Sequence, residues 1–590
     1  MAANDGDVIM HIYKIEIKNF RNFECFSWKP NPEVNILFGH NGCGKTNLAE
    51  ALSLVFSTSN FETHFELSDY YLGDDKKQIH IQVWFDDVSS LSTAISEHLQ
   101  HINENDQFIM DDTQGNGKAI IIYQLESGLD HTMEWSFYQQ IQQSFCKIKD
   151  RRAIDFIHID ANRQPLKEVG LQTRSAFYKM AQDTIGAEIE KISQELIGIA
   201  NDKLSTSSVI NNYLETLRSL GSIDIIEKYQ LLLKNPESTW NSSGYELGTS
   251  IGNAKLSFER QSKGIQNLFL LLLMKKRLEG SGIVFIEELE QNLEPKYQRY
   301  ITDKYRQLKV GQLFITSHSP DIISHFDYES ICVVSSRTAT QLLSRLGTAE
   351  LKEIHRMNKH EFISALMSSC VLLVEGDSEY ESFPVYSYNF ESALSKYDID
   401  LVKIGGKGKI EQYVKAFKHF DKKVYVLLDN DPDATAQINM ASANADAVFL
   451  SLNSYEDLIL SNIHPVAEKL NELVDFSIIK SKLIDIGSYD PELHKNKDVK
   501  KMAVKEHIVK DGINVSAVES YTDLCKFGSL LSYVLHDSFA SAYFARSIAY
   551  FIIESPDQPI FFKRLMEHMS PMGQKLENLD GYTNVYKLNG

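Results

Sequence analysis

The chain lacks paired cysteines, long apolar runs and a basic leader. Its six cysteines are scattered over 590 residues without a Cys-x-x-Cys pair, so neither a disulfide framework nor a zinc knuckle is indicated. The longest apolar run, Leu268 to Met274, is far shorter than the roughly 20 residues that cross a bilayer, and the first residues carry acids in place of a basic start. These absences predict a cytoplasmic protein without a membrane partner.

Basic residues are also outnumbered by acidic ones. Lys and Arg total 60 against 80 Asp and Glu, which gives a formal charge of -20 at pH 7. This charge argues against a protein that coats nucleic acid non-specifically, although local basic patches can still bind phosphate. Hydrophobic residues at 43% are typical of chains with ordinary cores. Because one core stops growing near roughly 250 to 300 residues, the length predicts several domains.

Short apolar segments alternate with helical periodicity along the chain, which is typical of α/β domains. Strands are expected within residues 12–23, 31–39, 78–87, 118–126, 153–161, 282–290, 312–320, 371–379, 400–406, 423–431 and 446–452. The stretch 167–238 has a mostly helical pattern and interrupts the first α/β region, and helices around 347–369 precede the second. The fold class is therefore α/β, with two parallel-sheet domains in series.

Residues Gly39 to Thr46, GHNGCGKT, fit the phosphate-loop pattern G-x-x-x-x-G-K-[ST] between an expected strand and an expected helix. Glycines let backbone amides close around phosphate oxygens, and the helix N-terminus adds a partial positive charge. Lys45 can reach the outer phosphates and Thr46 can ligate magnesium. The expected cofactor-binding residues here are Asn41, Gly42, Gly44, Lys45, Thr46 and Asn47.

Downstream segments supply further candidates for a nucleotide site. Glu287 and Glu288 end an apolar strand, and successive strand residues point to opposite faces. We therefore expect Glu287 to ligate magnesium and Glu288 to orient the water that attacks the γ-phosphate, with a solvated strand end as the alternative. The polar segment before the Leu-rich helix and the end of another strand add the last candidates: Ser262, Gly264, Gln266 and His318.

A second group of acids follows two apolar strands of the smaller sheet. Glu375 and Glu379 come after one strand, and Asp429 and Asp431 come after another. Because the carboxyl ends of neighbouring parallel strands share one crevice, these carboxylates would repel each other unless divalent cations bind there. Oxygen ligands favour Mg²⁺ or Mn²⁺, and two such ions can promote phosphodiester hydrolysis. Ordinary strand-end acids are the alternative.

The first α/β region resembles a known group of ATPases. NFRNF, GHNGCGKTNLAEAL, SKGIQ, IEELEQNLEP and TSHSPDI resemble the N-terminal strand, Walker A, signature, Walker B with D-loop and histidine switch of RecF- and SMC-type ABC ATPases, which include the OLD (overcoming lysogenization defect) nucleases. The resemblance implies a homodimer in which Ser262 and Gly264 of one subunit face the γ-phosphate of ATP held by the other. Many ABC ATPases carry Asp at the position of Glu287, whereas the pair Glu287 and Glu288 resembles the OLD branch. Arg163 resembles a basic position of such heads, with a surface salt bridge as the alternative.

The acids of the smaller sheet resemble a Toprim domain, the fold shared by topoisomerases, bacterial primases and OLD nucleases. The resemblance implies catalytic metal ligands after the two strands and one more on a later helix. These implied ligands are Glu375, Glu379, Asp429, Asp431 and Glu456. It also implies a late basic residue near the scissile phosphate, for which Arg546 is the candidate and Lys563 a poorer one.

These resemblances divide the chain into domains. The expected boundaries are 1–166 and 246–346 for the two parts of an ABC ATPase head, 167–245 for a helical insertion that dimerises, 347–369 for a helical linker, 370–460 for the Toprim core and 461–590 for a helical C-terminal region that completes the Toprim module.

The implied function is an ATP-binding, metal-dependent DNA endonuclease or nickase of the OLD family, a class associated with bacterial defence against phage. Two alternatives stay open. One is a non-cutting RecF-like repair ATPase or ATP-switched scaffold. The other is an effector held inactive by a helicase, or by a reverse transcriptase with its small nucleic acid. A lysine cluster from Lys495 to Lys505 is expected either to follow a DNA backbone or to form a solvated face.

Overall fold

The structure is a computed structural model, and the chain divides into an N-terminal unit, Met1–Ser344, and a C-terminal unit, Arg345–Gly590. The described residues are 11–58, 64–86, 93–109, 117–128, 130–140, 144–161, 208, 215, 229–233, 245–251, 254–390, 392–430, 435–451, 455–460, 463–489, 499–510, 512–527, 530–531, 534–535, 542–553, 560–569 and 584–588. Within this part of the chain, no helix combines the length and apolar character needed to cross a membrane.

The N-terminal unit contains an antiparallel sheet and a mainly parallel sheet. The antiparallel sheet consists of β1 (His11–Phe20), β2 (Phe23–Trp28), β4 (His80–Asp86), β5 (Gln100–Ile102), β6 (Phe108–Ile109), β7 (Lys118–Ser127), β8 (Met133–Phe137) and β9 (Ser144–Phe145). The second sheet has the order β10 (Phe156–Ile159), β14 (Ile283–Ile286), β15 (Gln312–Thr316), β3 (Val34–Phe38), β16 (Ile331–Val334) and β17 (Ala339–Gln341). Only β17 is antiparallel in it. Strands β14 and β15 are entirely buried, as their short apolar runs predict.

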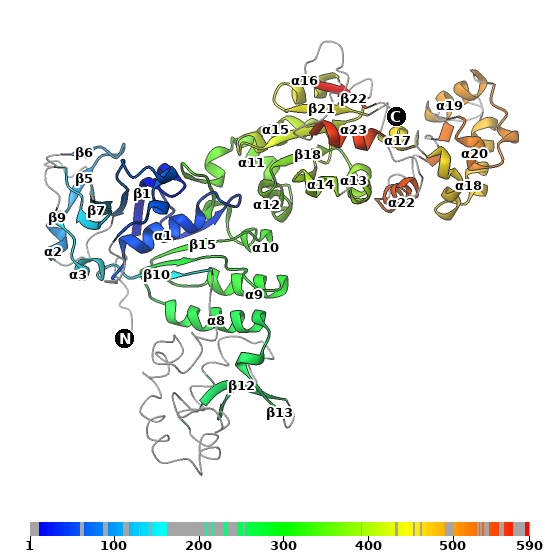
Figure 1. The fold of residues 1–590 in the computed structure, drawn as a ribbon. Coiled ribbons are helices and arrows are strands. Elements are labelled where there is room, and N and C mark those ends of the chain that lie inside the picture. Colours follow the sequence, from blue (N-terminus) through cyan, green and yellow to red (C-terminus); the bar gives the residue numbers. More distant parts are fainter. Residues whose placement is uncertain are drawn as a thin grey trace. The chain divides into compact units, whose positions relative to one another are not determined.

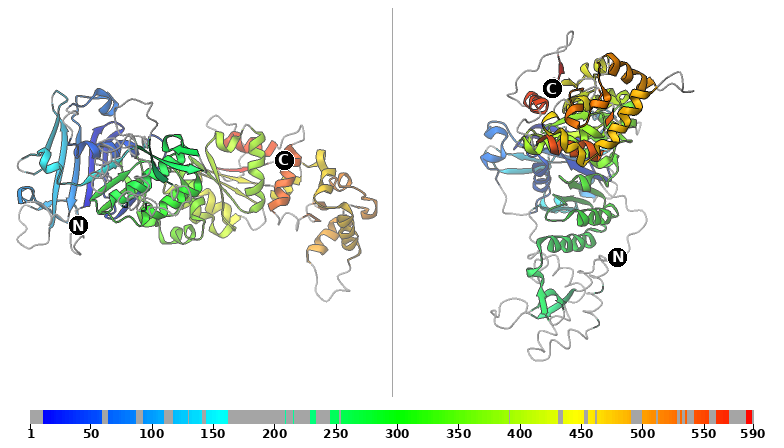
Figure 2. Two further views of the ribbon diagram at one scale, coloured as in Figure 1. Left: turned by 90° about the horizontal axis from the view of Figure 1, so that it is seen from below. Right: turned by 90° about the vertical axis from the view of Figure 1, so that its right-hand side faces the viewer.

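Helix α1 (Lys45–Val55) lies between these two sheets (Figure 1). Leu48, Leu52 and Val55 on its buried face share one hydrophobic core with strands of both sheets. Helices α8 (Lys263–Leu278) and α9 (Pro295–Arg306) run side by side on the other face of the parallel sheet (Figures 1 and 2). Because β3, β14 and β15 are parallel, their carboxyl ends meet at the edge where α1 begins.

The expected helical insertion differs from the structure where it is described. Strands β11 (Tyr229–Leu233), β12 (Tyr245–Ile251) and β13 (Ala254–Ser257) form a separate antiparallel sheet before α8. The helical expectation therefore does not hold at β11, where backbone pairing with β12 outweighs the helical propensity of a Leu-rich segment. Apart from residues 208 and 215, the stretch 162–228 lies outside the described residues.

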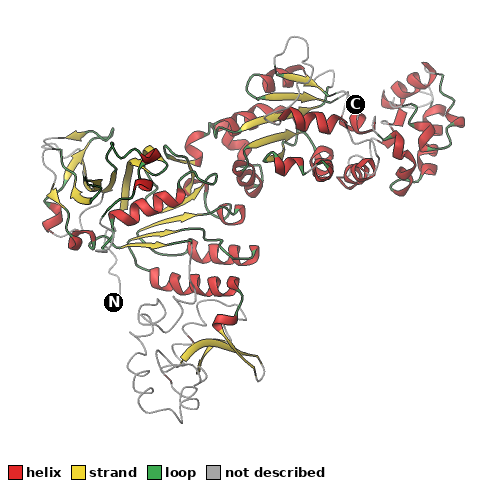
Figure 3. Cartoon of the chain, in the orientation of Figure 1, coloured by secondary structure: helices red, strands yellow, loops and turns green. Residues whose placement is uncertain are grey.

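The C-terminal unit is built on one parallel sheet with helices on both faces (Figure 3). Its strand order is β19 (Ile399–Lys403), β18 (Cys370–Val374), β20 (Lys423–Leu428), β21 (Ala447–Leu450) and β22 (Val585–Lys587). The sequence predicts the first four strands. It does not predict β22, because three residues carry too little pattern, and only pairing with β21 makes them a strand.

Helices surround this sheet and extend its core. They are α11 (Thr348–Ile354), α12 (Lys359–Met367), α13 (Asp377–Asn389), α14 (Ala393–Lys396), α15 (Ile410–Lys418), α16 (Thr435–Ser442), α17 (Tyr455–Leu460), α18 (Phe476–Ser488), α19 (Val499–Lys510), α20 (Tyr521–Leu524), α22 (Ala542–Ile553) and α23 (Ile560–Met569). One hydrophobic cluster runs from Leu372 and Leu427 on the strands to Ile548 and Leu565 on late helices. The late helices therefore pack into the same core as the sheet.

Candidate nucleotide and metal sites

The phosphate loop has the backbone that its glycines permit. Gly42 and Gly44 have φ angles of 79° and 111°, in the left-handed region that favours glycine. A Cβ atom on Gly44 would lie 2.6 Å from Cζ of Phe23. The buried Lys45 ammonium donates to the carbonyl oxygens of Gly39 at 2.9 Å and His40 at 3.3 Å. The loop is therefore closed around its own lysine.

The turn between β1 and β2 supports this loop. Asn22 donates to the Gly42 carbonyl at 3.4 Å, and Asn47 donates to the Asn22 side chain at 2.7 Å. Arg21 donates to Asn47 Oδ1 at 3.3 Å and forms an ion pair with Glu50. The NFRNF segment therefore fixes both the loop and the first turn of α1, and Asn47 is held by this turn while it lines the pocket.

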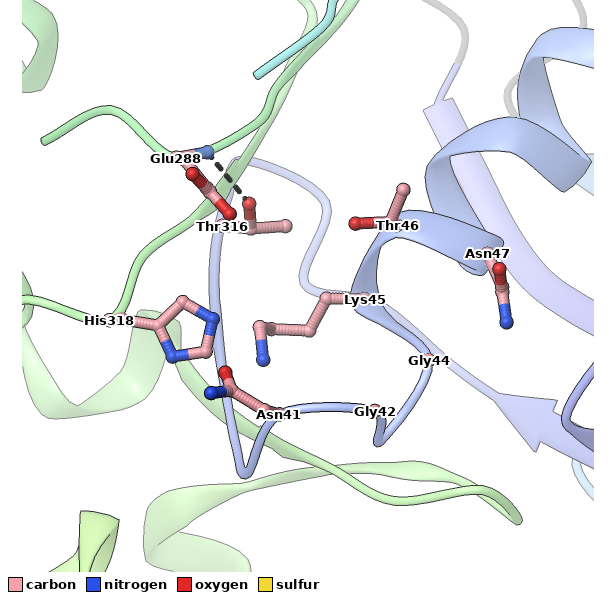
Figure 4. Close-up of a pocket in the computed structure, with 9 residues that line it drawn as sticks. All are labelled: Asn41, Gly42, Gly44, Lys45, Thr46, Asn47, Glu288, Thr316 and His318. Atoms are coloured by element: carbon pink, nitrogen blue, oxygen red, sulfur yellow. Dashed lines mark hydrogen bonds between the residues drawn. The ribbon is translucent and has the colours of Figure 1, made fainter. Parts of the chain in front are cut away.

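The loop faces a pocket of about 200 Å³ at the carboxyl edge of the parallel sheet (Figure 4). Its lining residues are Asn41, Gly42, Gly44, Lys45, Thr46, Asn47, Glu288, Thr316 and His318. The Lys45 side chain has Thr46 on one side of it and Glu288 and His318 on the other (Figure 4). Eight of these nine residues are sequence candidates, so the structure brings them together as expected. Thr316 is the addition: its hydroxyl accepts from the Glu288 backbone N–H at 2.9 Å, which holds Glu288 at a φ of 42°.

His318 enters the pocket as a neutral imidazole. Burial, with the Lys45 ammonium nearby, lowers the pKa of His318. Its backbone N–H donates to the carboxylate of Glu290, and burial raises the pKa of Glu290. A neutral His318 at pH 7 can accept or donate one hydrogen bond beside the outer phosphate position.

Glu287 precedes the pocket residue Glu288, and a histidine holds its carboxylate. Its side chain is 3% exposed, and its Oε1 lies 2.8 Å from Nε2 of His158 on β10. The other ring nitrogen, Nδ1, lies 2.8 Å from the hydroxyl of Ser53 on α1. Neither His158 nor Ser53 is a sequence candidate, because a histidine within an apolar strand carries no motif. Metal ligation by Glu287 stays a prediction.

The signature segment packs against the loop after β14. Ser262 caps α8, accepting from the Ile265 N–H at 3.4 Å, and is exposed. A Cβ on Gly264 would lie 2.8 Å from the Asn292 carbonyl oxygen, so this close contact requires glycine. Gln266 is fully buried and donates to three carbonyls of the preceding turn, including Phe258 O at 2.9 Å. Gln266 therefore shapes the turn instead of facing solvent, which differs from its expected contact with the cofactor.

In the C-terminal unit, strand register places two of the expected acids at one edge. Leu373 on β18 pairs with Val426 on β20, so Glu375 and Asp429 follow the ends of adjacent parallel strands. Asp429 Oδ1 accepts from the Ser451 hydroxyl at 2.9 Å and from the Tyr455 N–H at 2.7 Å. These contacts fix the carboxylate at the ends of β20 and β21.

Tyr455 connects this edge to the helix that follows Glu375. Its hydroxyl lies 2.6 Å from the hydroxyl of Ser382 on α13, and both side chains are buried. Neither Ser451 nor Tyr455 is a sequence candidate, although both lie in the segment that contains Glu456. Hydrogen bonds therefore join the ends of β20 and β21 to α13.

The other expected metal ligands are only partly described. Glu379 is buried in the first turn of α13, where its Oε2 accepts from the Gly376 N–H at 3.2 Å. Asp431 and the side chain of Glu456 lie outside the described residues. Among the residues that are described, no group of three or more His, Cys, Asp or Glu side chains forms a metal cage. The metal set stays a prediction.

Basic residues near the acids also have defined places. Lys403 ends β19 opposite Val374, so it stands beside the strand end that precedes Glu375, and its ammonium lies 2.6 Å from Asp377. The hydrogen bond to Asp377 raises the pKa of Lys403. Arg546 on α22 is exposed and lies 3.9 Å from Glu381 on α13. Lys403 belongs to no recognisable motif and is not a sequence candidate.

The lysine cluster is partly neutralised within the chain. Lys501 lies 2.5 Å from the Asp485 carboxylate, and the Lys505 ammonium donates to the Tyr489 carbonyl at 2.5 Å. Lys495 falls outside the described residues, as does Arg163 in the N-terminal unit, and Lys563 is exposed on α23. Binding of DNA by this cluster stays a prediction.

Two protein-family models match the chain. Residues 34–324 match the family described as "AAA domain, putative AbiEii toxin, Type IV TA system". Residues 366–431 match "Overcoming lysogenization defect protein-like, TOPRIM domain". The first match covers the phosphate loop, Glu287, Glu288 and His318, and the second covers Glu375 and Asp429.

Individual proteins give longer and shorter matches. Endonuclease GajA of Bacillus cereus (strain VD045) is 23% identical over 454 residues, which cover 72% of this chain and 75% of GajA. The DNA replication and repair protein RecF of Saccharophagus degradans is 37% identical over 54 residues, 9% of this chain and 15% of that RecF.

Solved structures of ATPase heads also align with the chain. The Smc head bound to the C-winged helix domain of ScpA aligns with a TM-score of 0.36 and 14% identity over 56% of this chain and 97% of that one. A RecF-ATPrS structure aligns with a TM-score of 0.32 and 13% identity over 57% of this chain and 98% of that one.

Proposed function

Since the chain joins an ATPase domain to an OLD-like Toprim domain, we propose that it is an ATP-dependent DNA endonuclease or nickase that requires a divalent cation. The predicted resemblance and the α/β fold class are confirmed by the same two family matches. The similarity to endonuclease GajA extends through both units and supports the nuclease assignment.

The observation that carries the proposal is the placement of Glu375 and Asp429 after adjacent parallel strands. Ser451 and Tyr455 orient the Asp429 carboxylate, and the described donors at this edge are hard oxygen atoms. Such donors suit Mg²⁺ or Mn²⁺, with Glu375, Glu379, Asp429 and Asp431 as the ligands and Glu456 as a further one. A bound cation would supply Lewis acid chemistry and activate water.

The chain's own residues would prepare the phosphodiester for attack. Lys403, at the same sheet edge, would neutralise a phosphate of the substrate backbone, and Arg546 would contribute a second positive charge beside α13. Tyr455 would keep Asp429 in place through its backbone N–H. Each of these roles concerns binding and orientation of the nucleic acid.

The geometry of the phosphate loop fits a nucleoside triphosphate with magnesium. Glycine backbone amides and Lys45 would hold the phosphates, and Thr46 would be a metal ligand. Glu288, oriented by Thr316, would position the attacking water, and neutral His318 would contact the outer phosphate. The exposed Ser262 would complete the site of a second subunit in an ATP-dependent homodimer, which light scattering with and without ATP would detect.

A plasmid-cleavage assay tests the nuclease. Wild-type protein with Mg²⁺ or Mn²⁺ should nick or linearise supercoiled DNA, and Asp429→Ala should reduce cleavage by roughly 100-fold or more. Asp421→Asn is the matched control, because Asp421 precedes β20 at the opposite edge and is 94% exposed. Equal cleavage by Asp429→Ala and wild type would contradict a catalytic role for the acids that follow β18 and β20.

A non-cutting repair ATPase is the second candidate, because two DNA replication and repair proteins RecF match 9% and 13% of this chain. It would hydrolyse ATP without cleaving DNA under any metal. Glu288→Gln should then trap an ATP-bound dimer if hydrolysis occurs. A role in phage defence and control by a helicase or a reverse transcriptase are further proposals, tested by co-purification from the native host.

A further inference from the structure

Three elements of the N-terminal unit meet in a hydrogen-bonded chain that ends on Glu287. Ser53 lies on the third turn of α1, His158 lies on β10, and Glu287 follows β14. The Ser53 Oγ to His158 Nδ1 and His158 Nε2 to Glu287 Oε1 distances are both 2.8 Å. The Glu287 side chain is 3% exposed and the His158 side chain 19% exposed, so this hydrogen bond lies largely out of solvent and restrains the carboxylate.

The chemistry of the three groups fixes the direction of the bond to Glu287. An ionised carboxylate only accepts hydrogen bonds, so the Nε2–H of His158 donates the hydrogen bond to Oε1 of Glu287. The Ser53 hydroxyl either donates to Nδ1 or accepts from it while donating to the Ala49 carbonyl, 2.9 Å away. In both arrangements the Nε2–H of His158 keeps its hydrogen bond to Glu287.

The backbone reinforces this contact. His158 pairs with Phe285 in the parallel register of β10 and β14, and the Glu287 N–H continues the ladder by donating to Ile159 O at 2.9 Å. The next residue, Glu288, turns into the left-handed region. Glu287 therefore has its backbone and one carboxylate oxygen tied to β10, while Glu288 turns toward the pocket.

We propose that His158 is a positioning residue that sets the orientation of Glu287 for magnesium at the nucleotide site, and that Ser53 orients the His158 ring. The inference rests on the proposed ATP-binding function. The hydrogen bonds connect α1, which begins at Lys45 of the phosphate loop, to the acid that is expected to ligate magnesium. The connection uses β10 as its support.

Amide substitutions separate the hydrogen bond from the bulk of the ring. In His158→Gln the side-chain nitrogen can occupy the place of Nε2, whereas in His158→Asn it reaches only the place of Nδ1. We expect His158→Ala and His158→Asn to raise the Mg²⁺ concentration for half-maximal ATP hydrolysis about tenfold or more, and to lower kcat with little change in KM for ATP. His158→Gln should stay within about threefold of wild type, and Ser53→Ala should show an intermediate effect.

Binding of a fluorescent ATP analogue in EDTA provides a readout that loss of folding would change and loss of positioning would not. It should be the same for all His158 variants and wild type. His80→Ala is the matched control, because His80 pairs with Glu126 at 2.6 Å in the antiparallel sheet of the same unit. That variant should leave the magnesium dependence unchanged.

The outcomes separate the inference from the function on which it rests. A wild-type protein that neither binds nor hydrolyses ATP overturns both. An active wild type overturns the inference alone if His158→Ala keeps the normal magnesium dependence, if His158→Gln is as impaired as His158→Asn, or if His80→Ala has the same effect.

Discussion

The two candidate sites are assembled from different lengths of chain. Most of the nucleotide pocket comes from the contiguous residues 41–47, whose backbone conformation is set by glycines. The acid edge combines Glu375, Asp429, Ser451 and Tyr455, which are separated by up to 80 residues and meet through strand register. A phosphate site can thus be encoded locally, whereas a carboxylate site depends on the sheet.

The largest expected effect is on ATP affinity, which should depend on the nucleotide pocket and be independent of the acids in the C-terminal unit. Lys45→Ala should lower ATP affinity by roughly 100-fold, because the charged donor to the phosphates is lost, while Asp429→Ala should leave that affinity unchanged. Isothermal titration with ATP and Mg²⁺ measures both. Lys304→Ala on α9 is the control, since Lys304 lies in the last turn of that helix and lines no part of the pocket. An ATP affinity within threefold of wild type for Lys45→Ala would contradict this assignment.

Alanine substitutions at two glycines with positive φ, one in each unit, compare how tightly the chain packs around them. Gly44→Ala combines a φ of 111° with a Cβ 2.6 Å from Phe23, and we expect a loss of about 3 kcal/mol in unfolding free energy. Gly405→Ala, after β19, has a φ of 62° and no atom within 4 Å of the new Cβ, so roughly 1 to 2 kcal/mol is expected. Urea denaturation of the full chain gives both values, and the comparison fails if Gly405→Ala costs as much as Gly44→Ala.

A buried lysine makes the stability of the C-terminal unit depend on pH in the alkaline range. Burial lowers the pKa of Lys422 to about 8, although its ammonium donates to the Ser368 carbonyl at 2.7 Å. Because the unfolded chain holds this proton up to about pH 10.5, the unit should gain stability as pH rises from about 8, by at most about 3 kcal/mol. Relative to Lys422→Met, wild type should therefore become more stable between pH 7 and 10. A difference that is constant over this range would contradict the assignment.

Glu290 should make the stability of the N-terminal unit decrease as pH rises, by a smaller amount than Lys422 increases that of the C-terminal unit. Burial raises the pKa of Glu290, so its protonated form is favoured in the folded state. Its stabilising contribution is complete below the unfolded pKa and is lost as pH rises through the folded pKa. Glu290→Gln should therefore match wild type near pH 4 and exceed its unfolding free energy by about 1 kcal/mol at pH 8. Thermal melts at the two pH values test the sign, and a wild type that outlasts the variant at pH 8 would refute it.

Much of the fold was predictable because buried parallel strands are apolar and end in recognisable residues. The segments containing β3, β14, β15, β18 and β20 were identifiable from such runs. Strand β2, with the sequence FECFSW, was missed because it follows β1 after a two-residue turn, and β22 was missed because it is short. Their pairing partners, β1 and β21, decide both.

The candidate residues show the same division. Lys45 and Glu288 were identifiable because each belongs to a motif of fixed spacing. Thr316 and Tyr455 were not, because their contacts join residues 28 and 26 positions apart along the chain. A hydrogen bond between distant segments leaves no local pattern in the sequence.

The amino-acid sequence by itself determined the phosphate loop, the acids after the strands and the α/β class, since these follow from glycine conformations, charge and apolar runs. Only the tertiary structure decided that Glu287 is held by His158, that Gln266 is buried in its own turn, and that Lys403 shares an edge with Glu375. Those facts depend on strand order and register, which set the neighbours of a side chain and are not encoded in any single segment.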